Sequence, residues 1–320
     1  MFRLKWYKSE ETPPPPPSQR VLIIDMPDLV MRKILEEVDL VSIMKLRKVC
    51  RAFRNYIDDT KPDSKLNRLT IYVRSDTILV LFRYFLSKPM KEETPSELAE
   101  VSYENNKQGC DIRFGEGQLK HINGRKAFDV FCEDMQTVLG NQKTTISHFY
   151  IYNREDESEI EKPPLLNFFQ KSLELFCCRR RSENTKTYPS QYANSIAMYN
   201  KVCGVILKIL KSRKHPLQVS NLSISINGQD QLETLLENVE SAKLKYLLID
   251  NDIYPTVKSE LNLDMLKNFG NLKDLLVFNV LITSSLESLS HIPIIKGTFK
   301  KITATEILAR KEVGYIFLPL

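Results

Sequence analysis

The sequence predicts an α+β protein in which a small unit of three helices is followed by a stack of alternating strands and helices. Apolar residues recur with a helical period between Asp25 and Ile57. A strand pattern then returns five times between Leu66 and Val277. The chain has 320 residues, of which 42% are hydrophobic and 27% charged, so its composition is that of a globular protein with about two domains.

A proline-rich tail is expected at residues 1–20. Pro13 to Pro17 are five consecutive prolines, which lack amide donors and favour an extended polyproline II rod. Such a segment can dock in an aromatic-lined groove or act as a stiff spacer, and the sequence leaves both readings open. We expect this tail to be disordered.

Residues 21–62 are expected to form three short helices. The first helix has an apolar stripe made of Pro27, Val30, Met31, Ile34, Leu35 and Val38. Asp39 interrupts the stripe and can cap the next helix. Lys61 precedes Pro62 and should end the unit, because the residue before a proline avoids helix. Three helices of this size cannot bury several apolar faces against one another, so they must pack against the rest of the chain or another protein.

The pattern of this unit resembles the F-box. The matching residues are Met26-Pro27-Asp28-Leu29-Val30, Ile34-Leu35, Val38, Asp39-Leu40-Val41, Leu46, Val49-Cys50-Arg51, Phe53 and Ile57. Three of them depart from the common pattern: Met26 replaces Leu, Leu29 stands where an acidic residue is frequent, and Phe53 replaces Trp. The resemblance implies that the helices dock on the Skp-family adaptor of a cullin–RING ubiquitin ligase.

On this basis we expect eight residues to contact the adaptor or to support those contacts directly: Pro27, Ile34, Leu35, Val38, Leu40, Leu46, Val49 and Cys50. Phe53 and Ile57 are expected to fix the unit to its own chain. A basic group could steer the encounter with an acidic adaptor: Lys45, Arg47, Lys48 and Arg51. The alternative is a helical subdomain whose apolar faces are purely internal.

The rest of the chain carries the pattern apolar-x-x-apolar-x-apolar. It starts at Leu66, Ile146, Val219, Leu244 and Leu272. The last three copies begin 25 and 28 residues apart, within the range of leucine-rich repeats. Helical stripes separate them, one at 232–239 and one at 263–269. The sequence therefore predicts a curved, parallel, leucine-rich-repeat-like αβ stack.

A stack of this kind exposes the side chains that alternate with its apolar strand positions. Six such residues are candidates for binding a protein target: Ser223, Ser225, Tyr246, Leu248, Asp274 and Leu276. We divide this part into an N-terminal αβ region, 63–190, with a basic loop near its end, and a C-terminal unit, 191–315. From about Ala193 to Ile302 the sequence resembles the FTH domain, which follows the F-box in a large nematode family.

The sequence offers little for catalysis. The four histidines do not pair at zinc-ligand spacing. Gly115 and Gly117 lack the third glycine of a dinucleotide-binding turn. Cys177 and Cys178 lie beside three arginines that could lower a thiol pKa, but no histidine is near in sequence. We therefore expect no catalytic residue, metal or cofactor, six reduced cysteines, no membrane span, and an intracellular protein of the cytoplasm, the nucleus or both.

These observations predict a non-enzymatic subunit that recruits a substrate to an SCF-type ubiquitin ligase, with the helices on the adaptor and the αβ stack on an unknown protein target. The alternative rests on residues 165–216, which hold ten basic and two acidic residues. They could serve a nucleic-acid-associated or scaffolding protein without ligase involvement. The same segment could also be a solvated helix face and a loop.

Overall fold

A computed structural model of the chain provides the structure. It describes residues 26–84, 98–115, 119–153, 189–251 and 259–309, together with residues 23 and 117. The expected proline-rich tail, the pair Cys177 and Cys178, and residues 165–188 of the basic segment lie outside the described residues.

The expected three-helix unit is confirmed. Its helices are α1 (Asp28–Glu37), α2 (Leu40–Val49) and α3 (Arg51–Thr60). The Asp39 carboxylate caps α2 as expected, because it accepts a hydrogen bond of 2.9 Å from the backbone N–H of Ser42. At the other end of the unit, Lys61 adopts a left-handed conformation with φ of 47° and donates its N–H to the Ile57 carbonyl, which ends α3.

The described part of the chain then forms an 11-stranded sheet with the order β11-β10-β8-β7-β6-β1-β2-β3-β4-β5, with β9 paired to β10. The strands are β1 (Leu66–Val73), β2 (Thr77–Tyr84), β3 (Leu98–Asn105), β4 (Gly109–Phe114), β5 (Leu119–Asn123), β6 (Ile146–Asn153), β7 (Val219–Ser225), β8 (Tyr246–Asp250), β9 (Ser259–Leu261), β10 (Asp274–Ile282) and β11 (Ile294–Phe299). Strands β1 to β5 form an antiparallel meander. Strand β1 also begins a parallel series that continues through β6, β7, β8 and β10 to β11.

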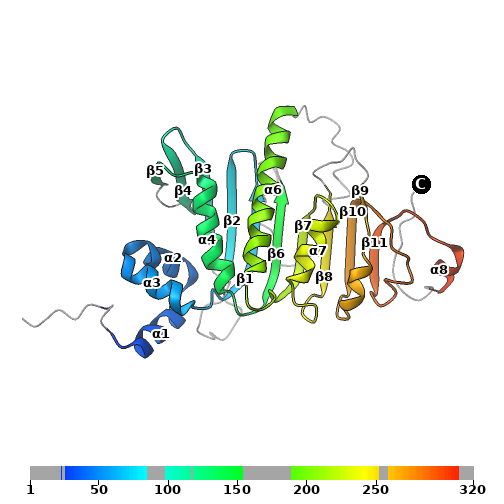
Figure 1. The fold of residues 1–320 in the computed structure, drawn as a ribbon, viewed down its shortest axis with the longest axis horizontal. Helices are drawn as coiled ribbons and strands as arrows, with labels where there is room; N and C mark the ends of the chain where they lie inside the picture. Colours follow the sequence, from blue (N-terminus) through cyan, green and yellow to red (C-terminus); the bar gives the residue numbers. More distant parts are fainter. Residues whose placement is uncertain are drawn as a thin grey trace, which may run out of the picture.

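Helices cover one face of this sheet. They are α4 (Ala127–Asn141), α6 (Pro189–Lys211) and α7 (Gln229–Glu237), and the short α8 (Ala304–Ala309) follows β11. Figure 1 shows α4, α6 and α7 side by side across the sheet, with the three N-terminal helices beside α4. The helix expected at 263–269 is instead the 3-10 helix η2 (Asp264–Asn268), whose bonds from Leu266 to Leu263 and from Phe269 to Leu266 span three residues. A stretch of five residues suits this tighter helix.

The repeated strand pattern of the sequence corresponds to one register. Two rows of apolar residues cross β1, β6, β7, β8 and β10: Leu69, Phe149, Leu222, Leu247 and Leu275, and then Ile71, Ile151, Ile224, Ile249 and Val277. All ten side chains are at most 2% exposed and belong to the main core beneath the helices. The α+β class is thus confirmed, whereas the leucine-rich-repeat-like character stays a prediction.

The boundary expected at residue 190 falls between β6 and β7. These strands are hydrogen-bonded neighbours, with Phe149 opposite Leu222 and Ile151 opposite Ile224. The N-terminal αβ region and the C-terminal unit expected from the sequence therefore share one sheet. Within the described residues, no helix is both long enough and apolar enough to cross a membrane.

Candidate functional site

The three N-terminal helices hold a small core of their own. Leu35, Ile43 and Ile57 are 2%, 3% and 0% exposed and contact one another, with partly buried side chains around them. Two polar links add to this packing. Arg47 forms a bidentate pair with Asp58, at 2.7 and 3.1 Å, which joins α2 to α3. The Tyr56 hydroxyl donates to Asp28 at 2.8 Å, which joins α3 to α1.

The structure divides the eight expected adaptor residues into three groups. Leu35 and Leu40 are buried within the chain, Ile34, Val38 and Leu46 are half-buried, and Pro27, Val49 and Cys50 are exposed. Leu40 belongs to the main core together with Met44, so it supports the position of α2. Ile57 is buried and Phe53 half-buried, and both had been expected to fix the unit to its own chain.

Five large apolar side chains in the described part of this unit are exposed, of which Ile23, ahead of α1, is 44% exposed. The other four are Met26, Leu29, Val30 and Val49, with exposed fractions of 36%, 68%, 43% and 67%. We call them the exposed apolar ends, because they lie at the start of α1 and the end of α2. Exposed apolar side chains of this size on one small unit are candidates for a contact with another protein.

Only Val49 of these four is among the contacts predicted from the sequence. There Leu29 is a departure from the family pattern, and Val30 is part of the apolar stripe of the first helix. The spacing of Leu29 and Met31 could have indicated that one of them is exposed, because residues two positions apart do not lie on the same face of a helix. With Met31 buried at 1% exposure, the side chain of Leu29 must point elsewhere.

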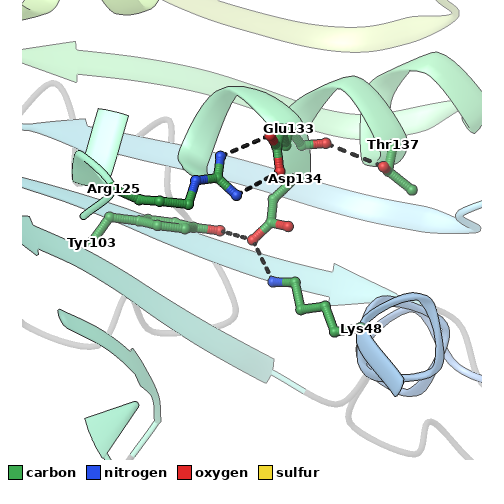
Figure 2. A network of polar contacts seen from close by, with 6 residues as sticks. All are labelled: Lys48, Tyr103, Arg125, Glu133, Asp134 and Thr137. Carbon is green, nitrogen blue, oxygen red and sulfur yellow. Dashed lines mark hydrogen bonds and ion pairs between the residues drawn. The ribbon is translucent and has the colours of Figure 1, made fainter. Parts of the chain in front are cut away.

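A buried polar network joins the three helices to the sheet region (Figure 2). The Lys48 ammonium at the end of α2 lies 3.0 Å from Asp134 Oδ2 on α4, and the Tyr103 hydroxyl on β3 donates to the same oxygen at 2.9 Å. Asp134 is only 3% exposed. Burial, and then the Asp134 carboxylate, raise the pKa of Tyr103 well above its ordinary value. The Tyr103 phenol therefore stays protonated and donates to Asp134.

Further contacts hold the same junction. The Ser64 hydroxyl is buried and donates to the Val138 carbonyl on α4 at 2.7 Å. The Lys65 ammonium donates to the Glu36 carbonyl at the end of α1. Together with the burial of Leu40 and Met44 in the main core, these contacts fix the helical unit against the sheet region.

The basic group expected to steer an adaptor is partly used inside the chain. Arg47 is paired with Asp58, and the hydrogen bond that its guanidinium donates to this carboxylate raises the pKa of Arg47. Lys48 is paired with Asp134. Lys45 and Arg51 remain exposed, so two of the four cations are paired within the chain, and the steering role of the group stays a prediction.

The six expected target-binding residues lie together on the sheet face opposite α4, α6 and α7. Tyr246 and Asp274 are paired neighbours in one row, and Leu248 and Leu276 in the next. Ser223 continues the second of these rows, opposite Leu248, and Ser225 lies in the following row, opposite Asp250.

Four of the six are buried, contrary to the exposure expected from the sequence: Ser223, Ser225, Leu248 and Leu276 are 2–5% exposed. Tyr246 and Asp274 are half-buried. Part of the reason is the register, which sets the small Ser223 between Tyr150 and Leu248. The buried Leu248 and Leu276 do not belong to the main core, which agrees with their place on the second face.

The described residues give no support to metal or thiol chemistry. They contain no group of three or more potential metal-ligating side chains. The described cysteines Cys50, Cys110, Cys132 and Cys203 are free. Burial raises the pKa of Cys132 to about 11 and that of Cys203 to about 12, so both stay as thiols at neutral pH.

Comparison with known proteins adds one match. A search of the curated proteins finds no similar protein. The comparison with family models finds no FTH domain, so that resemblance stays a prediction. It does find a match to the F-box domain over residues 23–65, which span the three helices and the exposed apolar ends. F-box domains bind Skp-family adaptors within cullin–RING ligases. Residues 23–65 of this chain are therefore an F-box domain.

Proposed function

We propose that this chain is a substrate-recruiting, non-catalytic subunit of an SCF-type cullin–RING ubiquitin ligase. The F-box binds the Skp-family adaptor, and the sheet region binds a target protein. The observation that carries this proposal is an F-box domain with large apolar side chains exposed at the ends of its helices. F-box proteins generally act as such adaptors and not as enzymes.

The exposed apolar ends supply the binding energy in this proposal. Leu29 and Val49 are each about two-thirds exposed, at 68% and 67%. Burying an exposed side chain of this kind contributes about 1.5–3 kcal/mol, and a few such anchors carry most of the energy of an interface. The buried residues Leu35 and Leu40 act indirectly, because they hold α1 and α2 in place.

The junction with the sheet region gives the F-box a second role. A ligase subunit must hold its target at a fixed position relative to the adaptor, because proximity accelerates transfer. The link from Lys48 to Asp134 and the burial of Leu40 and Met44 hold the F-box against α4 and the sheet. We infer that the adaptor and the target are presented by one rigid unit.

The double variant Leu29→Asp plus Val49→Asp is expected to weaken adaptor binding at least a hundredfold. Both side chains are exposed, so the F-box should keep its fold, whereas a carboxylate buried at the interface costs several kcal/mol. The measurement is calorimetric titration of the full chain with a purified Skp-family adaptor. The matched control is Leu119→Asp plus Ile294→Asp, at 52% and 39% exposure on β5 and β11, which should bind like the wild type.

Two results would contradict the proposal. Unchanged affinity of the Leu29 and Val49 variant would place the adaptor contact on another surface. A wild-type chain that shows its full helical circular dichroism and binds no Skp-family adaptor would rule out ligase recruitment.

The nucleic-acid alternative rests on residues 165–216, of which 189–216 are described. On α6 the side chains of Lys201, Lys208 and Lys211 are exposed, while Val202, Ile206 and Ile209 are buried. This is the arrangement of an amphipathic helix, with its cations in solvent and its apolar face in the core.

A further inference from the structure

A row of polar side chains crosses the sheet on the face opposite α4, α6 and α7. Strand pairing sets six residues in line, from β2 through β1, β6, β7 and β8 to β10: Arg83, Arg68, His148, Asn221, Tyr246 and Asp274. We call this set the polar row. All six side chains are half-buried, in contrast to the apolar rows on the helix-covered face.

Two arginines stand next to each other at one end of the polar row. Arg68 pairs with Arg83 across β1 and β2, and like charges placed opposite each other are destabilising. Within the described part of the chain neither guanidinium has an ion-pair partner, and the Nε atoms of both are buried without a hydrogen-bond partner. Burial and the neighbouring Arg68 lower the pKa of Arg83. The fold thus maintains an unfavourable pair of cations on this face.

The unpaired polar atoms continue along the sheet. Among the residues that the structure describes, His148 Nδ1, Asn221 Oδ1 and Ser223 Oγ are buried and have no hydrogen-bond partner. Burial, and then Arg68 and Arg83, lower the pKa of His148 to about 4, so its imidazole is neutral at physiological pH. Buried polar atoms without partners cost free energy, and native proteins contain few of them. These atoms are closed to solvent, so a ligand would meet the half-buried side chains of the row and not these atoms themselves.

We propose that the polar row binds an extended, acidic segment of the target protein, with its carboxylates against Arg68 and Arg83. This inference rests on the proposed function and names the kind of target. Arginine is suited to the role, because its planar fork binds a carboxylate with two hydrogen bonds. From β2 to β10 the row crosses five strand spacings of ~4.8 Å, roughly the length of seven residues in an extended chain. The Asp274 carboxylate at the far end favours amide or basic groups there.

A peptide fits this face better than single-stranded nucleic acid. Base stacking needs open aromatic faces. The tyrosines nearest the arginines pack on one another, since the rings of Tyr72 and Tyr152 stack at 5.8 Å and Tyr150 lies 5.8 Å from Tyr152. Tyr150 is also only 3% exposed. The carboxylate of Asp274 would further repel a phosphate backbone that followed the row.

The test is selection of a randomised nonapeptide display library on the full-length chain. We expect the wild type to enrich peptides with closely spaced Asp or Glu residues. Arg68→Gln plus Arg83→Gln should lose this enrichment, and the enriched peptide should bind it at least tenfold more weakly in fluorescence anisotropy. The matched control is Arg113→Gln plus Lys120→Gln, which removes the same charge from exposed positions on β4 and β5 and should bind like the wild type.

A loss of peptide binding in the Arg68→Gln plus Arg83→Gln variant would not be due to unfolding. Removing two adjacent like charges should leave the melting temperature of the Arg68 and Arg83 variant unchanged or raise it. A second variant, Arg68→Lys plus Arg83→Lys, keeps the charge but loses the bidentate fork, and should show intermediate affinity.

Three outcomes would overturn the inference: no acidic enrichment by the wild type, equal loss in the control variant, or binding of a fifteen-nucleotide oligo(dT) that depends on Arg68 and Arg83 without acidic enrichment. Adaptor titration of the same proteins separates this failure from failure of the proposed function. The Arg68→Gln plus Arg83→Gln variant should bind the adaptor as tightly as the wild type. If the wild-type chain enriched acidic peptides but bound no adaptor, the peptide site would be supported and the proposed function would not.

Discussion

Replacing Asp134 by alanine is expected to lower the free energy of unfolding by about 3–5 kcal/mol, because breaking a buried ion pair leaves its partner uncompensated. Asp134 is 3% exposed and accepts from both the Lys48 ammonium and the Tyr103 hydroxyl (Figure 2). Without the carboxylate, the half-buried Lys48 ammonium and the fully buried Tyr103 phenol would lose their partner. Urea denaturation followed by circular dichroism measures the loss.

The control for this prediction is the preceding residue of the same helix. Glu133 pairs with Arg125 at 2.7 Å, but the two side chains are 55% and 39% exposed. Exposed pairs contribute less than about 1 kcal/mol, so Glu133→Ala should change the unfolding free energy by no more than that. Equal losses of unfolding free energy in Asp134→Ala and Glu133→Ala would show that the buried network stabilises the fold no more than an exposed ion pair does.

A double-mutant cycle separates the ion pair from the rest of the network. Lys48→Met leaves Asp134 buried with only the Tyr103 hydrogen bond, and Asp134→Asn keeps an acceptor for Tyr103 without the charge. The loss of unfolding free energy in the double variant should be smaller than the sum of the losses in the two single variants. Each single variant leaves one charge without its partner, whereas the double variant leaves no charge at this site. Additive losses would mean that Lys48 and Asp134 do not stabilise each other. A loosened junction should also speed proteolysis between residues 60 and 66.

Much of the fold could be predicted from the sequence, because its signals are local. The helical stripe and the Asp39 cap specify α1 and the start of α2 within a few residues. The strand pattern that places Leu69 and Ile71 on one face recurs in β6, β7, β8 and β10, so these strands align in one register. Burial of both rows beneath the helices follows from the alternation of side chains in a strand.

The site was harder to predict, because it depends on contacts between distant residues. Lys48 and Asp134 are 86 positions apart, and no local pattern connects them. Arg68 and Arg83 become neighbours only through the hairpin of β1 and β2, whose register the sequence did not reveal. The burial of Leu248 on the second face depends likewise on side chains from adjacent strands. Exposure is a tertiary property, so periodicity alone could not rank the candidate residues.

The second large effect is expected within the F-box itself, where Leu35→Ala should cost about 2–5 kcal/mol. The fully buried core of this unit contains Leu35, Ile43 and Ile57, so the cavity left by the truncation has few neighbours that can close it. Amide hydrogen exchange should show faster exchange throughout α1, α2 and α3 and little change in β6 or β7.

Adaptor binding then distinguishes a structural role for Leu35 from a direct contact. Leu35 is 2% exposed, so its loss should weaken binding only by unfolding the F-box, and a saturating adaptor should restore slow exchange because binding favours the folded state. Val38→Ala, at the half-buried residue directly after α1, should cost only about 1 kcal/mol and leave the exchange of α3 nearly unchanged. A Leu35→Ala chain of wild-type stability that no longer bound the adaptor would instead place Leu35 in the interface, and α1 would have to turn its buried face outward on binding.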